Sequence, residues 1–324
     1  MLPNASVRGV SRVLEKLENS LREKNYYEAH QMYRTLYFRY LGQKKYEELL
    51  DLLYKGALIL LEKDQKLSGA DLSILLVDVM SKSKTAPCDS WFSKIIVLFT
   101  LIGPYVPERE TFLSNSLTWS KIGDNKLGHP ELHKKLAQAY WQEKNYGQAR
   151  YHYMFSMDGS GFASMLVELH TEKGLNGEID LFITQAVLQY LCRNNPSTAQ
   201  ETFIVYTEKH PSIRKIGPPY IFPLLNFLWF LLKAIQGEKQ LTTFTILCEQ
   251  YKPSLKRDPM YMQYLDKIGQ LFFGVPAPKN QNNGLFGDLM QSFLNSLDTN
   301  NDSSDEDQRS GTGAKHKIES AELD

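Results

Sequence analysis

The fold is decided by one stretch, Lys24-Asn25-Tyr26-Tyr27-Glu28-Ala29-His30, and by its second copy, Lys144-Asn145-Tyr146-Gly147-Gln148-Ala149-Arg150. In each copy a polar Lys-Asn pair precedes an aromatic residue, and a small Ala follows that residue by three positions. The pattern is typical of the turn between two helices of an α-solenoid, because the aromatic ring wedges between helices and the Ala lets their backbones approach. A weaker copy, Lys44-Lys45-Tyr46-Glu47-Glu48-Leu49, starts one helix later. We therefore expect consecutive helices joined by this short turn, which we call the helix joint.

Apolar residues recur at helical spacing along most of the chain. Gly56-Ala57 marks a point of close helix packing, and Ser68 with Asp71 has the spacing of a capping box before an apolar run. Gly128-His129-Pro130 and Asp258-Pro259 carry signals of helix starts. Because alternating β-branched runs are nearly absent, we predict an all-α, right-handed α-solenoid of helical hairpins, TPR-like, with about fifteen helices.

The composition allows a large core and disfavours nucleic acid as a partner. With 324 residues and 42% hydrophobic content, the chain can form one long array or two domains. Its net charge of zero hides an asymmetry: residues 298–324 contain eight acidic and three basic residues, which leaves an excess of five positive charges on residues 1–297. Nucleic-acid binding requires concentrated positive charge, so this mild excess argues against it.

Cysteine usage and hydropathy indicate a protein of a reducing compartment. Cys88, Cys192 and Cys248 are odd in number and far apart, so they form neither a disulfide framework nor a CxxC metal knuckle. Residues 1–8 lead into an amphipathic helix rather than a secretory signal. The most apolar run, residues 221–232, is shorter than the roughly 18–20 residues needed to cross a bilayer. We expect a cytosolic protein without stable membrane insertion.

Composition also divides the chain into segments. We expect residues 1–156 to form the N-terminal half of the solenoid and residues 157–278 its C-terminal half. Residues 279–298 are interpreted as a polar linker and a short amphipathic helix, and residues 299–324 as a disordered acidic tail that lacks the apolar content to offset its ordering entropy. The apolar residues of the short helix share one face: Leu285, Phe286, Leu289, Met290, Phe293, Leu294 and Leu297.

Two patterns resemble metal sites without meeting their requirements. His129 and His133 have the i, i+4 spacing of a zinc-protease helix, but a proline follows the first and no third ligand is near. A helix start with a second, surface histidine is the simpler interpretation. Residues 298–302 resemble the start of a calcium loop, in which Ser303 replaces the required Gly. No phosphate loop or nucleophile elbow stands out, so we predict a protein that is not an enzyme and has no cofactor and no metal.

Two segments have residue patterns suited to protein partners. Asp71 and Asp78 lie two helical turns apart on one face, about 10 Å from each other, where they could meet a basic partner. Asp71 would also be the acidic residue of the capping box. The helix expected near residue 225 is apolar on all sides, so it is either buried by neighbouring helices or partly covered by another chain. Its segment contributes five aromatic candidates: Tyr220, Phe222, Phe227, Trp229 and Phe230.

A series of motifs points to one protein family. The first is Tyr26-Tyr27-Glu28-Ala29-His30-Gln31-Met32-Tyr33-Arg34-Thr35-Leu36, followed by Phe38-Arg39-Tyr40. Others follow in order: Gly56-Ala57-Leu58, Ala70-Asp71-Leu72, Lys126-Leu127-Gly128-His129-Pro130, Met165-Leu166-Val167-Glu168, Gln185-Ala186-Val187-Leu188-Gln189, His210-Pro211-Ser212-Ile213, Leu224-Leu225-Asn226-Phe227, Asp258-Pro259-Met260-Tyr261 and Gly269-Gln270-Leu271-Phe272-Phe273-Gly274-Val275-Pro276. In their order and density they resemble the Golgi-to-ER traffic protein four family, the cytosolic adaptor of the guided-entry pathway for tail-anchored proteins.

The resemblance implies an α-solenoid that bridges two partners. In this family the N-terminal helices dock on the targeting ATPase that carries the hydrophobic anchor of a client. The C-terminal half holds a ubiquitin-like protein and, in animals, a BAG-family scaffold protein that the adaptor retains in the cytosol. The implied function is to relay tail-anchored proteins towards the ER membrane and to feed protein quality control.

The resemblance also assigns site residues. Five are assigned to the ATPase surface: Asp71, Asp78, Arg39, Lys44 and Lys45. The two lysines would have to replace the family's basic anchoring residue, because Gly42 stands at its position. The loop before Tyr220 is too short and Pro-rich for the β-hairpin with which some fungal members grip the ubiquitin-like protein. The five aromatic residues from Tyr220 to Phe230 are therefore assigned to contact with a BAG-family scaffold or ubiquitin-like partner.

Three other interpretations are weighed against the adaptor. A generic helical-repeat scaffold, such as a proteasome-lid-like subunit, would commonly add a winged-helix module with a small sheet, and no strand run is present in the sequence. Direct client or membrane binding by residues 285–297 would suit an interfacial helix, but its polar face lacks basic residues. An enzyme would require a metal at His129 and His133.

Overall fold

The computed structural model describes residues 5–121, 127–213 and 217–276, and every regular element in these ranges is helical. The first eight helices are α1 (Ala5–Arg22), α2 (Tyr26–Gly42), α3 (Tyr46–Glu62), α4 (Lys66–Lys82), α5 (Asp89–Ile102), α6 (Glu108–Trp119), α7 (Pro130–Gln142) and α8 (Tyr146–Phe155). The remaining elements are α9 (Gly159–Lys173), the 3-10 turn η1 (Asn176–Glu178), α10 (Ile179–Cys192), α11 (Pro196–Lys209), α12 (Pro223–Gln236), α13 (Leu241–Gln250), α14 (Lys252–Leu255) and α15 (Met260–Phe272). The predicted all-α solenoid is confirmed.

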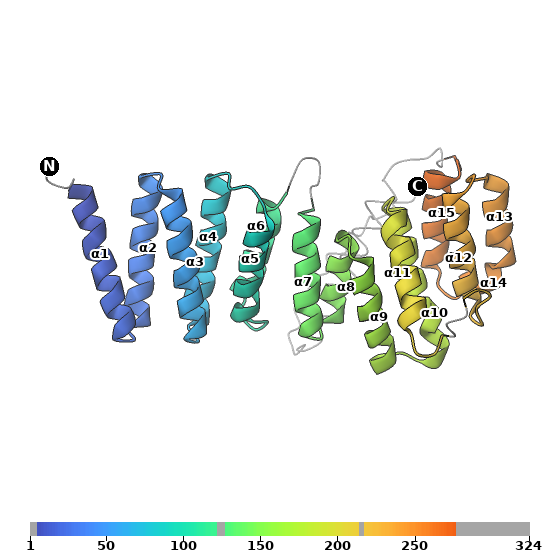
Figure 1. Cartoon of the computed structure of the whole chain (residues 1–324), viewed down its shortest axis with the longest axis horizontal. Coiled ribbons are helices and arrows are strands. Elements are labelled where there is room, and N and C mark those ends of the chain that lie inside the picture. Colours follow the sequence, from blue (N-terminus) through green and yellow to red (C-terminus); the bar gives the residue numbers. More distant parts are fainter. Residues whose placement is uncertain (1–4, 122–126, 214–216, 277–324) are drawn as a thin grey trace, which may run out of the picture. The chain divides into compact units, whose positions relative to one another are not determined.

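The helices stack in two layers. Neighbours in sequence form hairpins, such as α1 with α2, α3 with α4 and α7 with α8, while alternate helices also pack on each other, as α2 does on α4, α4 on α6, α3 on α5 and α5 on α7. Figure 1 shows α1 to α9 following one another along the array. In such an array each hairpin buries its apolar face mainly against its neighbours, and side chains on the outer faces stay available to partners.

The helix joint is a left-handed turn that recurs between helices. Lys24, Lys44 and Lys144 have φ of 60°, 56° and 60°, and the amide after each donates to a carbonyl five residues earlier, as Asn25 N does to Ser20 O at 2.8 Å. The side chain of Asn25 then caps the next helix by accepting from Glu28 N. Many helices end in this way: a residue in the left-handed conformation turns the chain so that the following amides donate to the last free carbonyls of the helix. The predicted joint is confirmed, and the same left-handed residue recurs at Asp64, Lys84 and Asn194.

Close contacts hold the first half of the array together. A Cβ added to Gly56 would lie 2.5 Å from Cε1 of Tyr33, which confirms this glycine as the point where α3 approaches α2. Farther along, Arg109 of α6 is 3% exposed. Its guanidinium lies 3.6 Å from the ring centre of Phe99 and forms a bidentate pair with Glu143, at the end of α7. Because Arg109 is buried, this stacked ion pair ties α5, α6 and α7 into one rigid region.

In the second half the chain returns on itself. α10 packs against α8, α9, α11, α12 and also α15. Asp180 of α10 is fully buried, and both its oxygens lie 2.9 Å from Nη1 of Arg257. Gln189 donates to the hydroxyl of Tyr264 at 3.1 Å, 75 residues later in sequence. Contacts of such long sequence separation are absent from a strictly serial array, so α10 is the centre of this half.

Two local predictions are corrected here. α4 begins at Lys66, and Gln65 at its N-cap makes no side-chain capping bond, so Ser68 lies inside the helix and forms no capping box with Asp71. His133 is fully buried rather than at the surface. The predicted helix start at His129-Pro130 is confirmed, because the His129 side chain accepts from Glu131 N at 3.1 Å.

The chain divides into two compact units, residues 1–277 and 278–324, and all described residues belong to the first. The predicted amphipathic helix within 279–298, the calcium-like segment and the acidic tail at 299–324 lie outside the described residues. Within the ranges described above, no helix is long and apolar enough to cross a membrane.

Candidate partner-binding surfaces

The two predicted acidic residues lie on the outer side of a parallel helix pair. α2 and α4 pack side by side, and each acid of α4 bonds to a residue of α2 that lies 41 positions earlier. His30 Nε2 is 2.7 Å from Asp71 Oδ2, and the Tyr37 hydroxyl donates to Asp78 Oδ2 at 2.6 Å. The seven-residue spacing of the acids therefore matches the seven-residue spacing of their partners. We call these four residues the acidic ladder.

Each acid of the ladder also faces a basic side chain. Arg34 Nη1 lies 3.6 Å from Asp71 Oδ1, which is an ion pair beyond hydrogen-bond length, and Lys82 Nζ lies 2.7 Å from Asp78 Oδ2. The hydrogen bond from His30, together with the charge of Arg34, lowers the pKa of Asp71 despite its partial burial. The two acid side chains are 32% and 35% exposed. Both are therefore partly open to solvent.

The sequence placed both acids correctly on one face but missed the residues that hold them. Their partners are separated from them by a whole helix in sequence, and a single chain pattern does not reveal such pairing. One signal was available, because His30 and Tyr37 repeat the spacing of Asp71 and Asp78. Tyr37 is 4% exposed, and its hydroxyl end meets the acid at the rim of the core.

The basic and apolar surroundings of the ladder are exposed. Lys44 and Lys45 lie in the joint after α2, and the Lys45 ammonium is 5.9 Å from the ring centre of Tyr40. Arg39 is exposed near the end of α2. Three large apolar side chains of α2 and α4 are also exposed: Tyr27 at 75%, Phe38 at 64% and Leu67 at 63%. Apolar side chains among charges are typical of surfaces that bind a protein partner.

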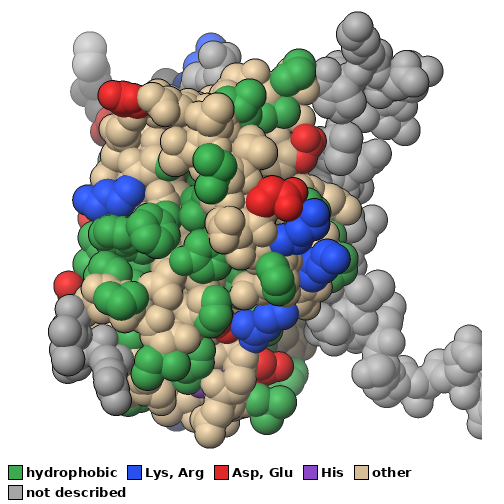
Figure 2. Space-filling model, turned by 90° about the vertical axis from the view of Figure 1, so that its right-hand side faces the viewer, with side chains coloured by type: hydrophobic (Ala, Val, Ile, Leu, Met, Phe, Trp, Pro, Cys, Tyr) green, Lys and Arg blue, Asp and Glu red, His purple; other side chains and the backbone are tan. Residues whose placement is uncertain are grey.

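The second predicted surface is centred on α12 and has two grooves. One, of about 270 Å³, lies between α11 and α12, and both Tyr220 and Trp229 line it. The other, of about 570 Å³, lies between α12 and α13, and Phe230 lines it with Ile246. Figure 2 looks onto the end of the array that carries these helices, where hydrophobic side chains are spread among Lys and Arg. Both grooves are large enough for an apolar side chain of a partner.

The structure divides the five aromatic candidates of this segment. Phe227 has no exposed surface, so its prediction as a contact residue is wrong: it faces inward with Leu224, Leu225, Leu228 and Leu231. The backbone of Tyr220 is held by the Asn226 side chain. Tyr220 N donates to Asn226 Oδ1 at 2.7 Å, and Asn226 Nδ2 donates to Tyr220 O at 2.8 Å. Trp229 and Phe222 are half-buried, and Phe230 is 46% exposed. The helix is thus buried on one side by its neighbours and open on the other, and its coverage by another chain stays a prediction.

Comparison with known proteins identifies the family. The family model described as Golgi to ER traffic protein 4 matches residues 43–294. The Golgi to ER traffic protein 4 homolog of Oryzias latipes is 53% identical over 289 residues, which cover 89% of each chain. The Homo sapiens homolog is 52% identical over 289 residues, covering 89% of this chain and 88% of the relative. This chain belongs to the Golgi to ER traffic protein 4 family.

The fold agrees with a solved member of the Golgi to ER traffic protein 4 family. A crystal structure of C. therm. Get4 matches with a TM-score of 0.75 and 26% sequence identity, covering 88% of this chain and 96% of that chain. The family match includes Asp71, Asp78 and all of α12. The resemblance inferred from the ordered motifs is confirmed.

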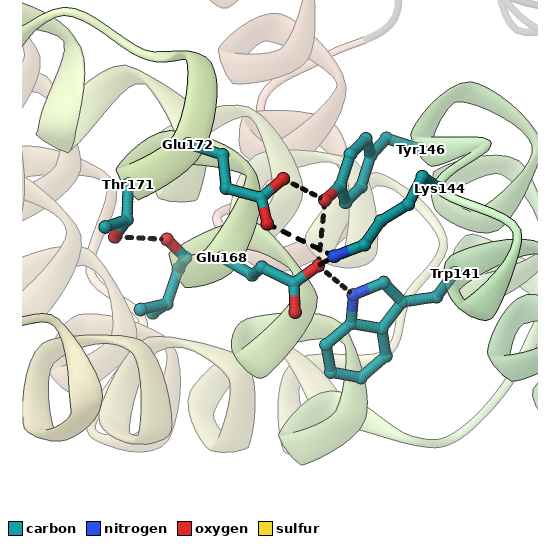
Figure 3. A network of polar contacts seen from close by, with 7 residues as sticks. Trp141, Lys144, Tyr146, Glu168, Thr171 and Glu172 are labelled. Atoms are coloured by element: carbon teal, nitrogen blue, oxygen red, sulfur yellow. Dashed lines mark hydrogen bonds and ion pairs between the residues drawn. The ribbon is translucent and has the colours of Figure 1, made fainter.

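A polar network in the middle of this family member is structural. Figure 3 shows the second helix joint attached to α9. Glu168 Oε1 accepts from Trp141 Nε1 at 2.8 Å, from Lys144 Nζ at 2.7 Å and from the Tyr146 hydroxyl at 2.8 Å. Glu172 Oε1 accepts from the same lysine at 3.1 Å, and its Oε2 lies 2.6 Å from the Tyr146 hydroxyl, whose one proton can be donated to only one of the two carboxylates at a time. The hydrogen bond from Lys144 lowers the pKa of Glu168. The Lys144 ammonium and both carboxylates have hydrogen-bond partners within the network, which holds the joint in place.

Four of the histidines form two buried pairs. His133 Nδ1 lies 2.9 Å from His152 Nδ1, and its Nε2 donates to Leu127 O at 3.0 Å. A second pair joins His170 Nδ1 to His210 Nε2, at 2.9 Å. Burial lowers the pKa of His133 to about 4 and that of His210 to about 4. Among the residues with described positions, no group of three or more His, Cys, Asp or Glu could hold a metal ion.

Proposed function

We propose that this protein is a non-enzymatic adaptor in the targeting of tail-anchored membrane proteins to the ER. It bridges the targeting ATPase, through α2 and α4, to a BAG-family scaffold and its ubiquitin-like partner, through α12, and it retains that complex in the cytosol. The observation that carries the proposal is the presence of two different surfaces at separate places along one helical array. Family membership supports the same conclusion.

The chemistry of the two surfaces suits two kinds of binding. The two acids of the acidic ladder are partly exposed, and charged contacts favour fast, salt-sensitive exchange with a basic partner. The grooves beside Trp229 and Phe230 are mainly apolar, and apolar burial is typical of long-lived complexes. A client-carrying ATPase must come and go, whereas the scaffold stays. The proposal assigns each surface accordingly.

Co-purification of the full chain with each partner tests the proposal. The double variant Asp71→Lys with Asp78→Lys is expected to lose capture of the ATPase and to keep the scaffold complex. The reverse result is expected for Trp229→Ala with Phe230→Ala. A matched control is Asp51→Lys with Asp64→Lys, since these side chains are 60% and 89% exposed and lie outside α4. Loss of both partners from the acidic variant, or equal loss from the control, would contradict the assignment.

The enzyme alternative has less support. A metal at His129 and His133 would need both rings to face one site. His133 instead uses both nitrogens inside the core, one towards His152 and one towards Leu127 O. Elemental analysis of the purified protein checks this, with a stoichiometric transition metal as the contrary result.

A further inference from the structure

We propose that His30 and Tyr37 are positioning residues, which hold the carboxylates of Asp71 and Asp78 in a fixed outward orientation for the basic side chains of the ATPase. This inference rests on the proposed function, because it assigns a role within the same surface. It adds two residues of α2 that contact no partner themselves.

In each acid, one carboxylate oxygen bonds to a residue of α2 and the other is available to a partner. We call them the held oxygen and the presented oxygen. Oδ2 of Asp71 bonds to His30, and its Oδ1 meets only the longer ion pair with Arg34. Oδ2 of Asp78 receives both the Tyr37 hydroxyl and the Lys82 ammonium, which leaves its Oδ1 as the presented oxygen. A carboxylate has lone pairs on both oxygens, so a partner can bind the presented one while α2 keeps the other.

The holding residues are buried while the counter-charges are exposed. His30 is 8% exposed and Tyr37 is 4% exposed, whereas the Arg34 and Lys82 side chains are 44% and 48% exposed. A basic residue of the partner can therefore displace Arg34 from Asp71 Oδ1 while His30 stays bonded, and it can approach Asp78 Oδ1 while Tyr37 and Lys82 stay on Oδ2. Side chains already ordered before docking lose less conformational entropy on binding. Removing one holding bond should then weaken binding about threefold to tenfold, since ordering a long side chain has a cost of that size.

The competing role for these bonds is only to fasten α2 to α4. Fastening would affect the whole array and both partners. Positioning would affect ATPase binding alone, and only while the acids are present. A double-variant cycle separates the two roles because the loss from Tyr37→Phe should vanish once Asp78 has been changed to a side chain that the ATPase does not use.

The test measures the affinity of the full chain for the ATPase in single variants. Tyr37→Phe and His30→Leu should each weaken binding about threefold to tenfold. His30→Gln should restore most of the affinity, since the Gln amide can donate from the position of Nε2. In an Asp78→Asn background, Tyr37→Phe should have no further effect, and the scaffold complex should be unchanged throughout. Carboxyl carbon NMR should report a raised pKa of Asp71 in His30→Leu, where the hydrogen bond is lost.

The outcomes separate this inference from the function on which it rests. If the double charge reversal of Asp71 and Asp78 abolishes ATPase capture but Tyr37→Phe and His30→Leu leave the affinity within about twofold, the positioning role is wrong and the proposed function stands. If Tyr37→Phe weakens binding equally in the Asp78→Asn background, the residue only fastens the helices. If the charge reversal itself has no effect on capture, both the function and the inference fail.

Discussion

Mild acid should destabilise this protein through histidines that the fold keeps neutral. Burial lowers the pKa of His133 and His210 to about 4 from 6.5, and it holds the pKa of His152 well below its usual value. The unfolded chain therefore binds more protons than the folded chain once the pH falls below about 6.5. The sign follows directly: the free energy of unfolding falls as the pH is lowered from about 6.5 towards 4, and it recovers above that range.

The magnitude follows from the two protonation states. At about pH 5.5 an unfolded histidine is about 90% protonated while the buried ones stay neutral, so each lowers the free energy of unfolding by about 1.4 kcal/mol relative to about pH 7.5. Three such histidines give about 4 kcal/mol. Urea unfolding of the full chain, followed by circular dichroism at the two pH values, measures the sum.

One variant isolates a single histidine. His210→Gln keeps a donor towards His170 Nδ1 but cannot titrate, so its pH-dependent loss should be smaller by about 1.4 kcal/mol. The control Tyr206→Phe removes a buried hydroxyl that donates to Ile179 O at 2.7 Å, one helical turn from His210. It should lower the stability equally at both pH values. An identical pH dependence in the wild type and His210→Gln would refute the reasoning.

Two further predictions concern packing and buried charge. Gly56→Ala should lower the free energy of unfolding by about 1–3 kcal/mol, because its Cβ would overlap the Tyr33 ring, whereas Gly42→Ala, with no neighbour within 4 Å, should not lower it. Thermal denaturation compares the two variants. Asp180→Asn should remove about 3 kcal/mol, because a fully buried carboxylate loses its ion pair with a guanidinium that is 35% exposed. The exposed Asp266→Asn should change stability by under about 0.5 kcal/mol in the same urea experiment, and equal losses would contradict the account.

Local sequence signals predicted the fold well where a turn has its own chemistry. The Lys-Asn joint was recognisable because Asn25 and Asn145 cap the following helix from within three residues. The Gly56-Ala57 packing point was recognisable because glycine weakens a helix interior, and a close approach by a neighbouring helix compensates for that cost. The capping box at Ser68 failed because its spacing was right but α4 had already begun at Lys66.

Long-range pairing could not be predicted from the sequence. His133 was expected at the surface as the second histidine of a helix start, yet its ring is buried, with Nδ1 against His152 of the next helix and Nε2 donating to Leu127 O. Phe227 and Phe230 are equally apolar, and only the packing around α12 decides that Phe227 is buried, with its ring against Tyr251, while Phe230 is exposed. The holding of Asp71 by His30 likewise depends on α2 and α4 being parallel neighbours.

Because α15 packs back onto α10, cutting the chain has different consequences in the two halves of the array. In the first half the helices pack mainly on helices one or two positions away, so a cut there severs contacts between neighbouring hairpins, such as the buried Arg109–Glu143 pair between α6 and α7. In the second half a chain ending before Arg257 would leave the Asp180 carboxylate buried without its counter-charge. A cut in the first half thus separates neighbouring hairpins, whereas a cut in the second half also breaks contacts between helices far apart in sequence.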